Sequence, residues 1–236
     1  MLSFFSGPVA CPVEPAVKQW VEHRLTWLVG QFGRQRLLGG TVVLPTPEFF
    51  PDPFDGSPDS ARPILARVCG YMGIDPAKVE LDFYEYRRPP DAKRSDAAAG
   101  RFRVWLEESN LYDPTALVAA LAHAVGHIHL DRRLAAEAAD REPLADLLTV
   151  FFGLGIFSAN AVLHESYWNN GEFSGWRIGR RGYLGMPAYG YALALYAQAR
   201  CEDDPPWARY LRLDVRTALR QGQRFLRETG DTTFRG

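Results

Sequence analysis

Apolar residues recur at intervals of three and four positions in several segments, which is the spacing of one face of an α-helix. Residues 15–37 and 61–72 both show this spacing, and the second segment ends at Gly73, a residue type that often terminates helices. A helical C-terminal part is expected over about residues 187–228. The pattern therefore predicts helices toward both ends of the chain.

A regular alternation of apolar and polar residues, which is typical of a β-strand, occurs in the middle of the chain. It predicts strands at residues 79–86 and 101–109, which we expect to be antiparallel neighbours, and a β-branched strand at 41–44. Residues 87–100 and 164–186 are predicted to be loops. Together with the helices, these strands predict an α+β fold in which a small, mainly antiparallel sheet packs on central helices.

Two central helices are predicted after the strands. The first follows Asp113 and Pro114, which suit the N-cap and the first helical position, and it is rich in alanine. The second begins near Glu142 and runs through the apolar residues 147–163. This stretch is almost long enough to cross a bilayer, but polar residues and glycines interrupt it. We therefore expect a buried core helix and no membrane span.

The composition is that of a folded globular protein. The chain has 236 residues, of which 47% are hydrophobic and 23% are charged, and 27 basic against 28 acidic side chains give a net charge of −1. The apolar content excludes disorder as the main state, and the balanced charge gives no argument for binding to nucleic acid or to an acidic membrane. No linker divides the sequence, so we expect one domain over residues 1–236.

The cysteines and the first residues indicate the compartment. Cys11, Cys69 and Cys201 lie far apart and form no CxxC motif, which favours a reducing environment. The first fifteen residues contain no basic segment followed by a long apolar run, so no signal peptide is predicted. These features together favour the cytoplasm.

Histidines and acids on the two central helices have the spacing of a metal site. His123 and His127 lie on one face of the first helix, one turn apart, where both imidazoles can bind one cation at about 2.0–2.1 Å. If the second helix packs back on the first, Glu142 can complete a His2Glu set with one open position. Asp146, one turn later, can accept a hydrogen bond from a liganding imidazole. One zinc ion is therefore the expected cofactor.

The segment LAHAVGHIHL resembles the HExxH helix of zinc metallopeptidases, and REPLADLL resembles the ExxxD motif of their gluzincin group. The resemblance covers about residues 79–160 and implies a zincin-like fold. It implies that the two motif histidines and Glu142 are zinc ligands, and that Asp146 orients one of the histidines. The sequence departs from the family at Ala124, which stands where gluzincins have the glutamate that acts as general base.

The family mechanism explains why this difference matters. In gluzincins the zinc ion activates a bound water and polarises the scissile carbonyl, and the glutamate takes the water proton. The resemblance implies zinc-dependent hydrolysis of a peptide or protein substrate, with this chain inactive or nearly so. Because the rest of the motif is intact, we interpret Ala124 as a disabling replacement in an otherwise active peptidase. Two alternatives are a natural pseudoenzyme that binds zinc and a partner peptide, and a pair of core histidines without metal.

Three further segments carry candidate residues. His164, just beyond the apolar stretch, is a candidate for stabilising the tetrahedral oxyanion, and four nearby tyrosines compete for this role. Val104, Trp105 and Leu106 lie on a predicted strand before the metal helix, where zincin-like folds bind substrate as an added strand; an ordinary covered strand is the alternative. Arginines at intervals of three and four over residues 209–227 are interpreted as a solvated helix face.

Overall fold

The computed structural model of the chain describes residues 9–85, 95–96, 100–133, 139–169, 174–180 and 183–236. Its α-helices are α1 (Pro15–Phe32), α2 (Arg34–Gly39), α3 (Pro58–Met72), α4 (Pro114–Asp131), α5 (Arg141–Phe151), α6 (Gly155–Ala161), α7 (Met186–Ala199) and α8 (Leu213–Thr229). Its strands are β1 (Val79–Tyr84), β2 (Ser95–Asp96), β3 (Arg101–Glu107), β4 (Leu163–Asn169) and β5 (Ser174–Arg180). Short 3-10 helices are η1 (Pro76–Lys78), η2 (Glu108–Tyr112) and η3 (Pro206–Tyr210).

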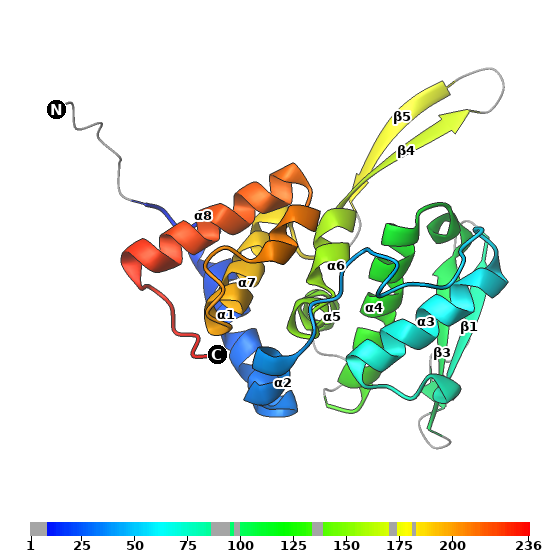
Figure 1. The fold of residues 1–236 in the computed structure, drawn as a ribbon, viewed down its shortest axis with the longest axis horizontal. Helices are drawn as coiled ribbons and strands as arrows, with labels where there is room; N and C mark the ends of the chain where they lie inside the picture. The colour runs from blue at the N-terminus through cyan, green and yellow to red at the C-terminus, as the bar shows by residue number, and fades with distance from the viewer. Residues whose placement is uncertain (1–8, 86–94, 97–99, 134–138, 170–173, 181–182) are drawn as a thin grey trace.

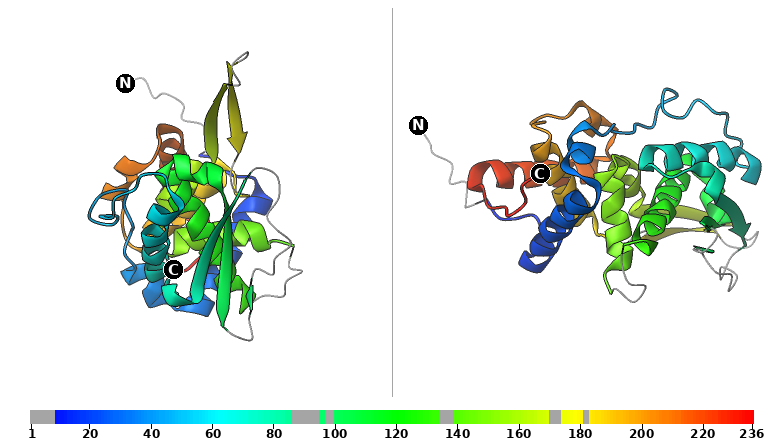
Figure 2. Two further views of the ribbon diagram at one scale, coloured as in Figure 1. Left: turned by 90° about the vertical axis from the view of Figure 1, so that its right-hand side faces the viewer. Right: turned by 90° about the horizontal axis from the view of Figure 1, so that it is seen from below.

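Helices make up most of the molecule, and a small sheet lies at one end (Figure 1). At the opposite end, α7 packs against both α1 and α8. Behind the sheet, α3 packs on β1 and α4 packs on β3, while α5 and α6 lie between these helices and α7 (Figure 2). One continuous cluster of buried apolar residues includes side chains from both ends. The expected α+β class is confirmed.

The expected antiparallel pairing of the two central strands is wrong. β1 and β3 are parallel, with Val79 opposite Phe102 and Tyr84 opposite Glu107. β2 pairs antiparallel with the first residues of β3, which gives the strand order β1-β3-β2. A parallel pair needs a connection of about a dozen residues or more, and residues 85–100 are long enough to provide it. Alternation in the sequence identifies the faces of a strand and does not give its direction.

A second correction concerns residues 164–186, which were predicted to be a loop. β4 and β5 form an antiparallel hairpin that projects from the body of the molecule, with Leu163 opposite Arg180 and Asn169 opposite Ser174 (Figure 1). Glycine and asparagine, which are frequent in this segment, are depleted in strands. The composition therefore concealed the hairpin.

The apolar residues 147–163 contribute to two helices and not to one. The break between α5 and α6 lies at Gly153, whose φ of +83° is one that glycine adopts without strain. A Cβ atom at this position would clash with the carbonyl oxygen of Thr41, and the carbonyl of Gly153 accepts a hydrogen bond from Val43 N–H at 2.9 Å. No helix in the described part of the chain has the length and apolar character needed to cross a membrane.

Predictions for the N-terminal part are partly wrong and partly confirmed. The helix expected at 15–37 is divided at Gly33 into α1 and α2, and residues 41–44 form no strand with any described segment. The predicted start of α4 and the predicted end of α3 are confirmed, although α3 begins at Pro58 and not at residue 61. The carboxylate of Asp113 caps α4 by accepting the N–H of Thr115 at 2.8 Å, and α3 ends at the left-handed Gly73.

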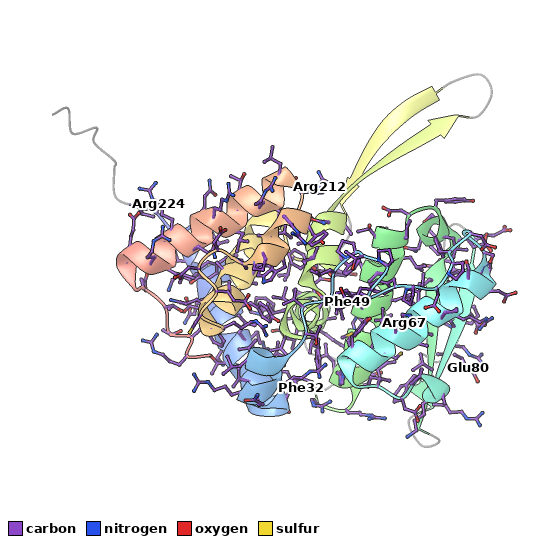
Figure 3. All side chains as sticks on the ribbon, viewed as in Figure 1. Phe32, Phe49, Arg67, Glu80, Arg212 and Arg224 are labelled. Atoms are coloured by element: carbon purple, nitrogen blue, oxygen red, sulfur yellow. The ribbon has the colours of Figure 1, made fainter. Side chains whose placement is uncertain are left out.

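Two of the C-terminal arginines, Arg212 at the N-cap of α8 and Arg224 within it, lie on the outer side of this helix (Figure 3). Arg212 forms an ion pair with Asp214 at 3.2 Å, and Arg224 forms one with Glu228 at 2.8 Å. The opposite face of α8 packs against α7. At these two positions the arginines belong to a solvated helix face with local acidic partners.

A buried carboxylate joins the N-terminal helix to the C-terminal part. Glu22 on α1 is only 1% exposed. It accepts hydrogen bonds from the Tyr191 hydroxyl at 2.5 Å and from the Thr233 N–H and hydroxyl at 3.0 and 2.7 Å, and it pairs with Lys18 at 3.1 Å. Burial alone would raise the pKa of Glu22, but these partners outweigh it and lower the pKa to about 2.

This network predicts how stability depends on pH. A carboxylate whose pKa falls on folding contributes stability that is complete above its usual pKa of 4.5 and is lost as the pH falls toward 2. We expect Glu22→Gln to lower the free energy of unfolding by about 1–3 kcal/mol at pH 7. The loss should be much smaller near pH 2.5. Urea unfolding at both pH values measures it, with the exposed Glu108→Gln as control, and equal losses at the two pH values would contradict the explanation.

Candidate metal centre

Three side chains from two helices converge on one point. Nε2 of His123 lies 3.1 Å from Nε2 of His127, and these two atoms lie 3.2 and 3.1 Å from Oε2 of Glu142. Ligands about 2.0–2.1 Å from a tetrahedral Zn²⁺ are separated by about 3.3–3.4 Å, so a triangle of this size fits the ion with its fourth position open. Within the described residues, this is the group of histidine, cysteine and acidic side chains that could hold a metal ion.

Close packing of α4 against α5 brings these residues together. Gly126, which lies between the two histidines, faces Ala145, and a Cβ atom at position 126 would lie 3.2 Å from the Ala145 carbonyl oxygen. Most real Cβ contacts are longer, so a larger residue would push the helices apart. Asp140, directly before α5, accepts hydrogen bonds from Trp20 Nε1 at 2.9 Å and from Arg24 at 2.5 Å. These contacts hold the beginning of α5, where Glu142 lies.

Asp146 supports the site from the buried side. Its Oδ1 accepts a hydrogen bond from Nδ1 of His123 at 2.7 Å. Its Oδ2 accepts the backbone N–H groups of Tyr183 at 2.6 Å and Leu184 at 2.9 Å, and the Tyr189 hydroxyl also interacts with the carboxylate. The side chain is 3% exposed. Because Nδ1 is the donor to Asp146, the Nε2 atom of His123 is left to face the ligand triangle.

The charges around the triangle favour a cation. Burial alone would lower the pKa of His123, but hydrogen bonds to Asp146 and Glu142 raise it to about 9. The pKa of Glu142 is held well below its usual range by its contacts with the two histidines, while burial lowers the pKa of His127. The two carboxylates thus stabilise one positive charge between them. Without a metal that charge is a proton on His123, and a divalent ion can replace it.

The triangle opens into a cavity of about 380 Å³ between β3, α4 and α6. A face of small residues along α4 lines it, namely Ala116, Ala119, Ala120 and Ala124. Side chains from other elements complete the wall, most of them larger, namely Tyr84, Arg103, Val104, Trp105, Leu106, Ser158, Ala161, Tyr183 and Tyr189. A volume of this size is at the lower end of the range for small-ligand sites. The predicted substrate strand, Val104 to Leu106, therefore lies beside the candidate metal ligands.

Two other histidines of this part of the chain, His129 and His164, are not among the residues that form the ligand triangle. His164 lies on β4, but its side chain is outside the described part of the structure. His129, two residues after His127, is buried, donates a hydrogen bond from Nε2 to the Met72 carbonyl at 2.8 Å and stacks on Phe152. Its side chain contributes to the core and has no contact with the ligand triangle.

Sequence reasoning missed part of the site because its signal lies in the backbone. The donors of Tyr183 and Leu184 are main-chain N–H groups, which any residue type except proline provides. The ring of Tyr183 is stacked on His123, with centroids 6.1 Å apart, and is 59% exposed at the mouth of the cavity. Several tyrosines were candidates in this region, and only the fold singles out Tyr183 and Tyr189.

The comparisons with known proteins add no family to this geometry. No family model, no curated protein and no solved structure matches the chain.

The geometry predicts binding of about one equivalent of zinc. His127→Ala removes one corner of the triangle and should abolish tight binding, whereas His23→Ala, in α1, should leave it unchanged. Elemental analysis after gel filtration, followed by titration of the metal-free protein with zinc, measures both. Full zinc retention in His127→Ala would show that the ion binds elsewhere.

Asp146 should control affinity without contacting the ion. Loss of a partner that orients a liganding histidine typically weakens metal binding by about 10- to 100-fold, so we expect this loss in Asp146→Ala. Asp131 lines the same cavity but pairs with Arg141, and Asp131→Asn should have little effect. Competition with a zinc chelator gives the affinities, and thermal unfolding of each metal-free variant tests its fold. An unchanged affinity in Asp146→Ala would contradict the assigned role.

Proposed function

We propose that the chain is a zinc metallopeptidase of the gluzincin type with a zincin-like fold, in which Ala124 disables catalysis. The observation that carries the proposal is the convergence of His123, His127 and Glu142 at 3.1–3.2 Å. The buried Asp146 adds support, because it holds His123 in the orientation that a metal ligand needs. The cysteine pattern favours a cytoplasmic location.

Each residue has a separate chemical task in this proposal. When bound, zinc activates water and polarises the carbonyl of the substrate. The two histidines and Glu142 would hold the ion, and Asp146 fixes the tautomer of His123. Ala124 lines the same cavity as these ligands, and its side chain ends at Cβ. At position 124, where gluzincins have the glutamate that transfers the proton, alanine cannot perform this task.

Peptides and proteins are the proposed substrates because of the strand beside the centre. β3 is paired with β1 along its length, but β2 covers the other edge only at Arg101 and Phe102. Within the described residues, the edge from Arg103 to Glu107 has no strand partner. A peptide can pair with such an edge through main-chain hydrogen bonds, which would place its carbonyl groups along the cavity. His164 is kept as a candidate for stabilising the oxyanion, with Tyr183 at the cavity mouth as its rival.

Ala124 itself favours a second candidate function. A natural pseudoenzyme would bind zinc and a partner peptide without cleaving it, and the present site has the parts for binding but not for proton transfer. The two functions differ in one measurable respect. In a disabled peptidase the rest of the site is competent, so that one glutamate restores the reaction.

We expect Ala124→Glu to raise peptide hydrolysis by about 10²- to 10⁴-fold, the usual contribution of general acid–base catalysis. Activity should disappear with a chelator and in the double variant with His127→Ala. Ala124→Gln is the matched control, because it has nearly the same size and cannot take up the proton. A whole-proteome peptide pool, read by mass spectrometry, serves as substrate.

The same assay separates the two candidate functions. Chelator-sensitive cleavage in Ala124→Glu alone supports the disabled peptidase. An inert Ala124→Glu variant that binds zinc and whose parent captures a peptide from the pool supports the pseudoenzyme. Equal cleavage by the glutamate and glutamine variants would contradict a role for position 124 in proton transfer.

A further inference from the structure

We propose that one side of α8 binds the phosphate backbone of double-stranded nucleic acid without reading its sequence. This side, called here the arginine face, carries Arg212, Arg216, Arg220, Arg224 and Arg227. The first of them is the N-cap residue of α8, and the other four lie within the helix. The proposal goes beyond the peptidase function and does not depend on the candidate metal centre.

The spacing of these arginines places them on one side of the helix. Four of them follow one another at intervals of four residues, and the fifth comes three residues later. At about 100° per residue, all five lie within about a third of the helix circumference. Arg212 and Arg224 are seen on the outer side of α8 in Figure 3. At about 1.5 Å per residue, their positions are about 18 Å apart along the helix axis.

Three of the five arginines have charges that the chain itself does not neutralise. Two members of the face pair with acids at the two ends of the helix, as described with the fold. Within the described residues, Arg216, Arg220 and Arg227 have no acidic partner. Arg220 and Arg227 are exposed, and Arg216 is partly buried. These three side chains are therefore available to an external anion.

Positive charge is concentrated in this segment of the chain. Residues 209–227 contain six arginines and one acidic residue, Asp214, which gives the segment a net charge of +5. Because the whole chain has a net charge of −1, the remaining residues together carry −6. A cluster of positive charge on one exposed helix face is typical of a surface that binds a polyanion. The balanced net charge of the whole chain conceals this separation.

The apolar side of α8 argues against a membrane or an acidic protein as the polyanion. Val215, Leu219 and Leu226 are buried, and this side of the helix packs against α7. It is therefore not available to a bilayer, which an amphipathic helix binds through its apolar side, or to the apolar core of a protein interface. Leu213 is the one large apolar side chain of α8 that is exposed. Binding to a phosphate backbone needs only regularly spaced positive charge.

A duplex fits the arginine face better than a single strand does. Surfaces that bind single strands stack the bases on aromatic side chains. The one aromatic residue of α8, Phe225, is buried. A duplex carries one negative charge for each 1.7 Å of its axis, which gives about ten charges along the arginine face. Contacts with phosphates carry no sequence information, so binding should be independent of sequence.

Fluorescence anisotropy of a labelled duplex of about 20 base pairs tests the proposal with the full-length protein at about 50 mM salt. We expect binding that weakens steeply as the salt concentration rises, with a slope of about −0.9 for each phosphate contact in a plot of log K against log salt. Two duplexes of unrelated sequence should bind with the same affinity.

The main variant combines Arg216→Gln, Arg220→Gln and Arg227→Gln. Glutamine is a good helix former, and these substitutions leave the buried side of α8 unchanged. Loss of three phosphate contacts should weaken duplex binding by at least about tenfold at about 50 mM salt and should reduce the salt slope by about 2–3.

The matched control removes the same charge from exposed arginines on other elements. It combines Arg34→Gln, Arg62→Gln and Arg101→Gln. This control should bind the duplex nearly as well as the parent protein. Circular dichroism checks that both combined variants are folded. If the main variant is not folded, Arg220→Gln alone is compared with Arg62→Gln, and the expected change in slope is about 0.9.

The possible outcomes decide between the arginine face and its alternatives. Salt-dependent duplex binding that the main variant loses and the control retains supports the proposal. An absence of binding at about 50 mM salt, or an equal loss in both combined variants, overturns it. Tighter binding to phosphatidylserine vesicles or to polyglutamate than to duplex, at equal concentration of negative charge, also overturns it. None of these measurements involves a metal ion, so failure of the metal centre leaves this test valid.

Discussion

The buried carboxylate of Asp146 is the interaction on which the rest of the site depends. It lies on α5, and its partners are a histidine on α4, the Tyr189 hydroxyl on α7 and the N–H groups of Tyr183 and Leu184. A buried charge persists only if donors surround it, so these three segments must meet at one point. The same requirement turns Nε2 of His123 toward the cavity. The contacts that join these segments in the fold therefore also orient His123 for the ligand triangle.

Two glycines allow the helices around Asp146 to pack closely. Gly126 allows α4 to approach the backbone of α5 at Ala145, and Gly153 allows the chain to turn sharply after α5 against Thr41. The turn at Gly153 lets α6 lie across α4, where Ser158 and Ala161 form one wall of the cavity. The glycines thus shape the site although neither contributes a functional group.

Local signals in the sequence predicted the parts of the site that lie within one element. The N-cap of α4 was predictable from Asp113 and Pro114, and the approach of its two histidines was predictable from their four-residue spacing. Glu142 was predictable as their partner once the next helix was expected to pack back on α4. Long-range relations were not predictable. The parallel pairing of β1 with β3 depends on the path of residues 85–100. The donors of Tyr183 and Leu184 are backbone N–H groups, which almost every residue type has, so the sequence does not indicate them.

Zinc peptidase sites usually combine metal binding with proton transfer, and Ala124 bears on how these two properties are related in the proposed centre. A glutamate there would place a second carboxylate near Glu142 in a partly apolar cavity, where like charges repel and burial disfavours ionisation. Such a residue is unfavourable without a metal and becomes favourable when a divalent ion supplies the compensating charge. Ala124 avoids this conflict, because alanine adds no charge and is a strong helix former. The proposed centre therefore retains the groups for metal binding and has, at position 124, no group that can accept a proton.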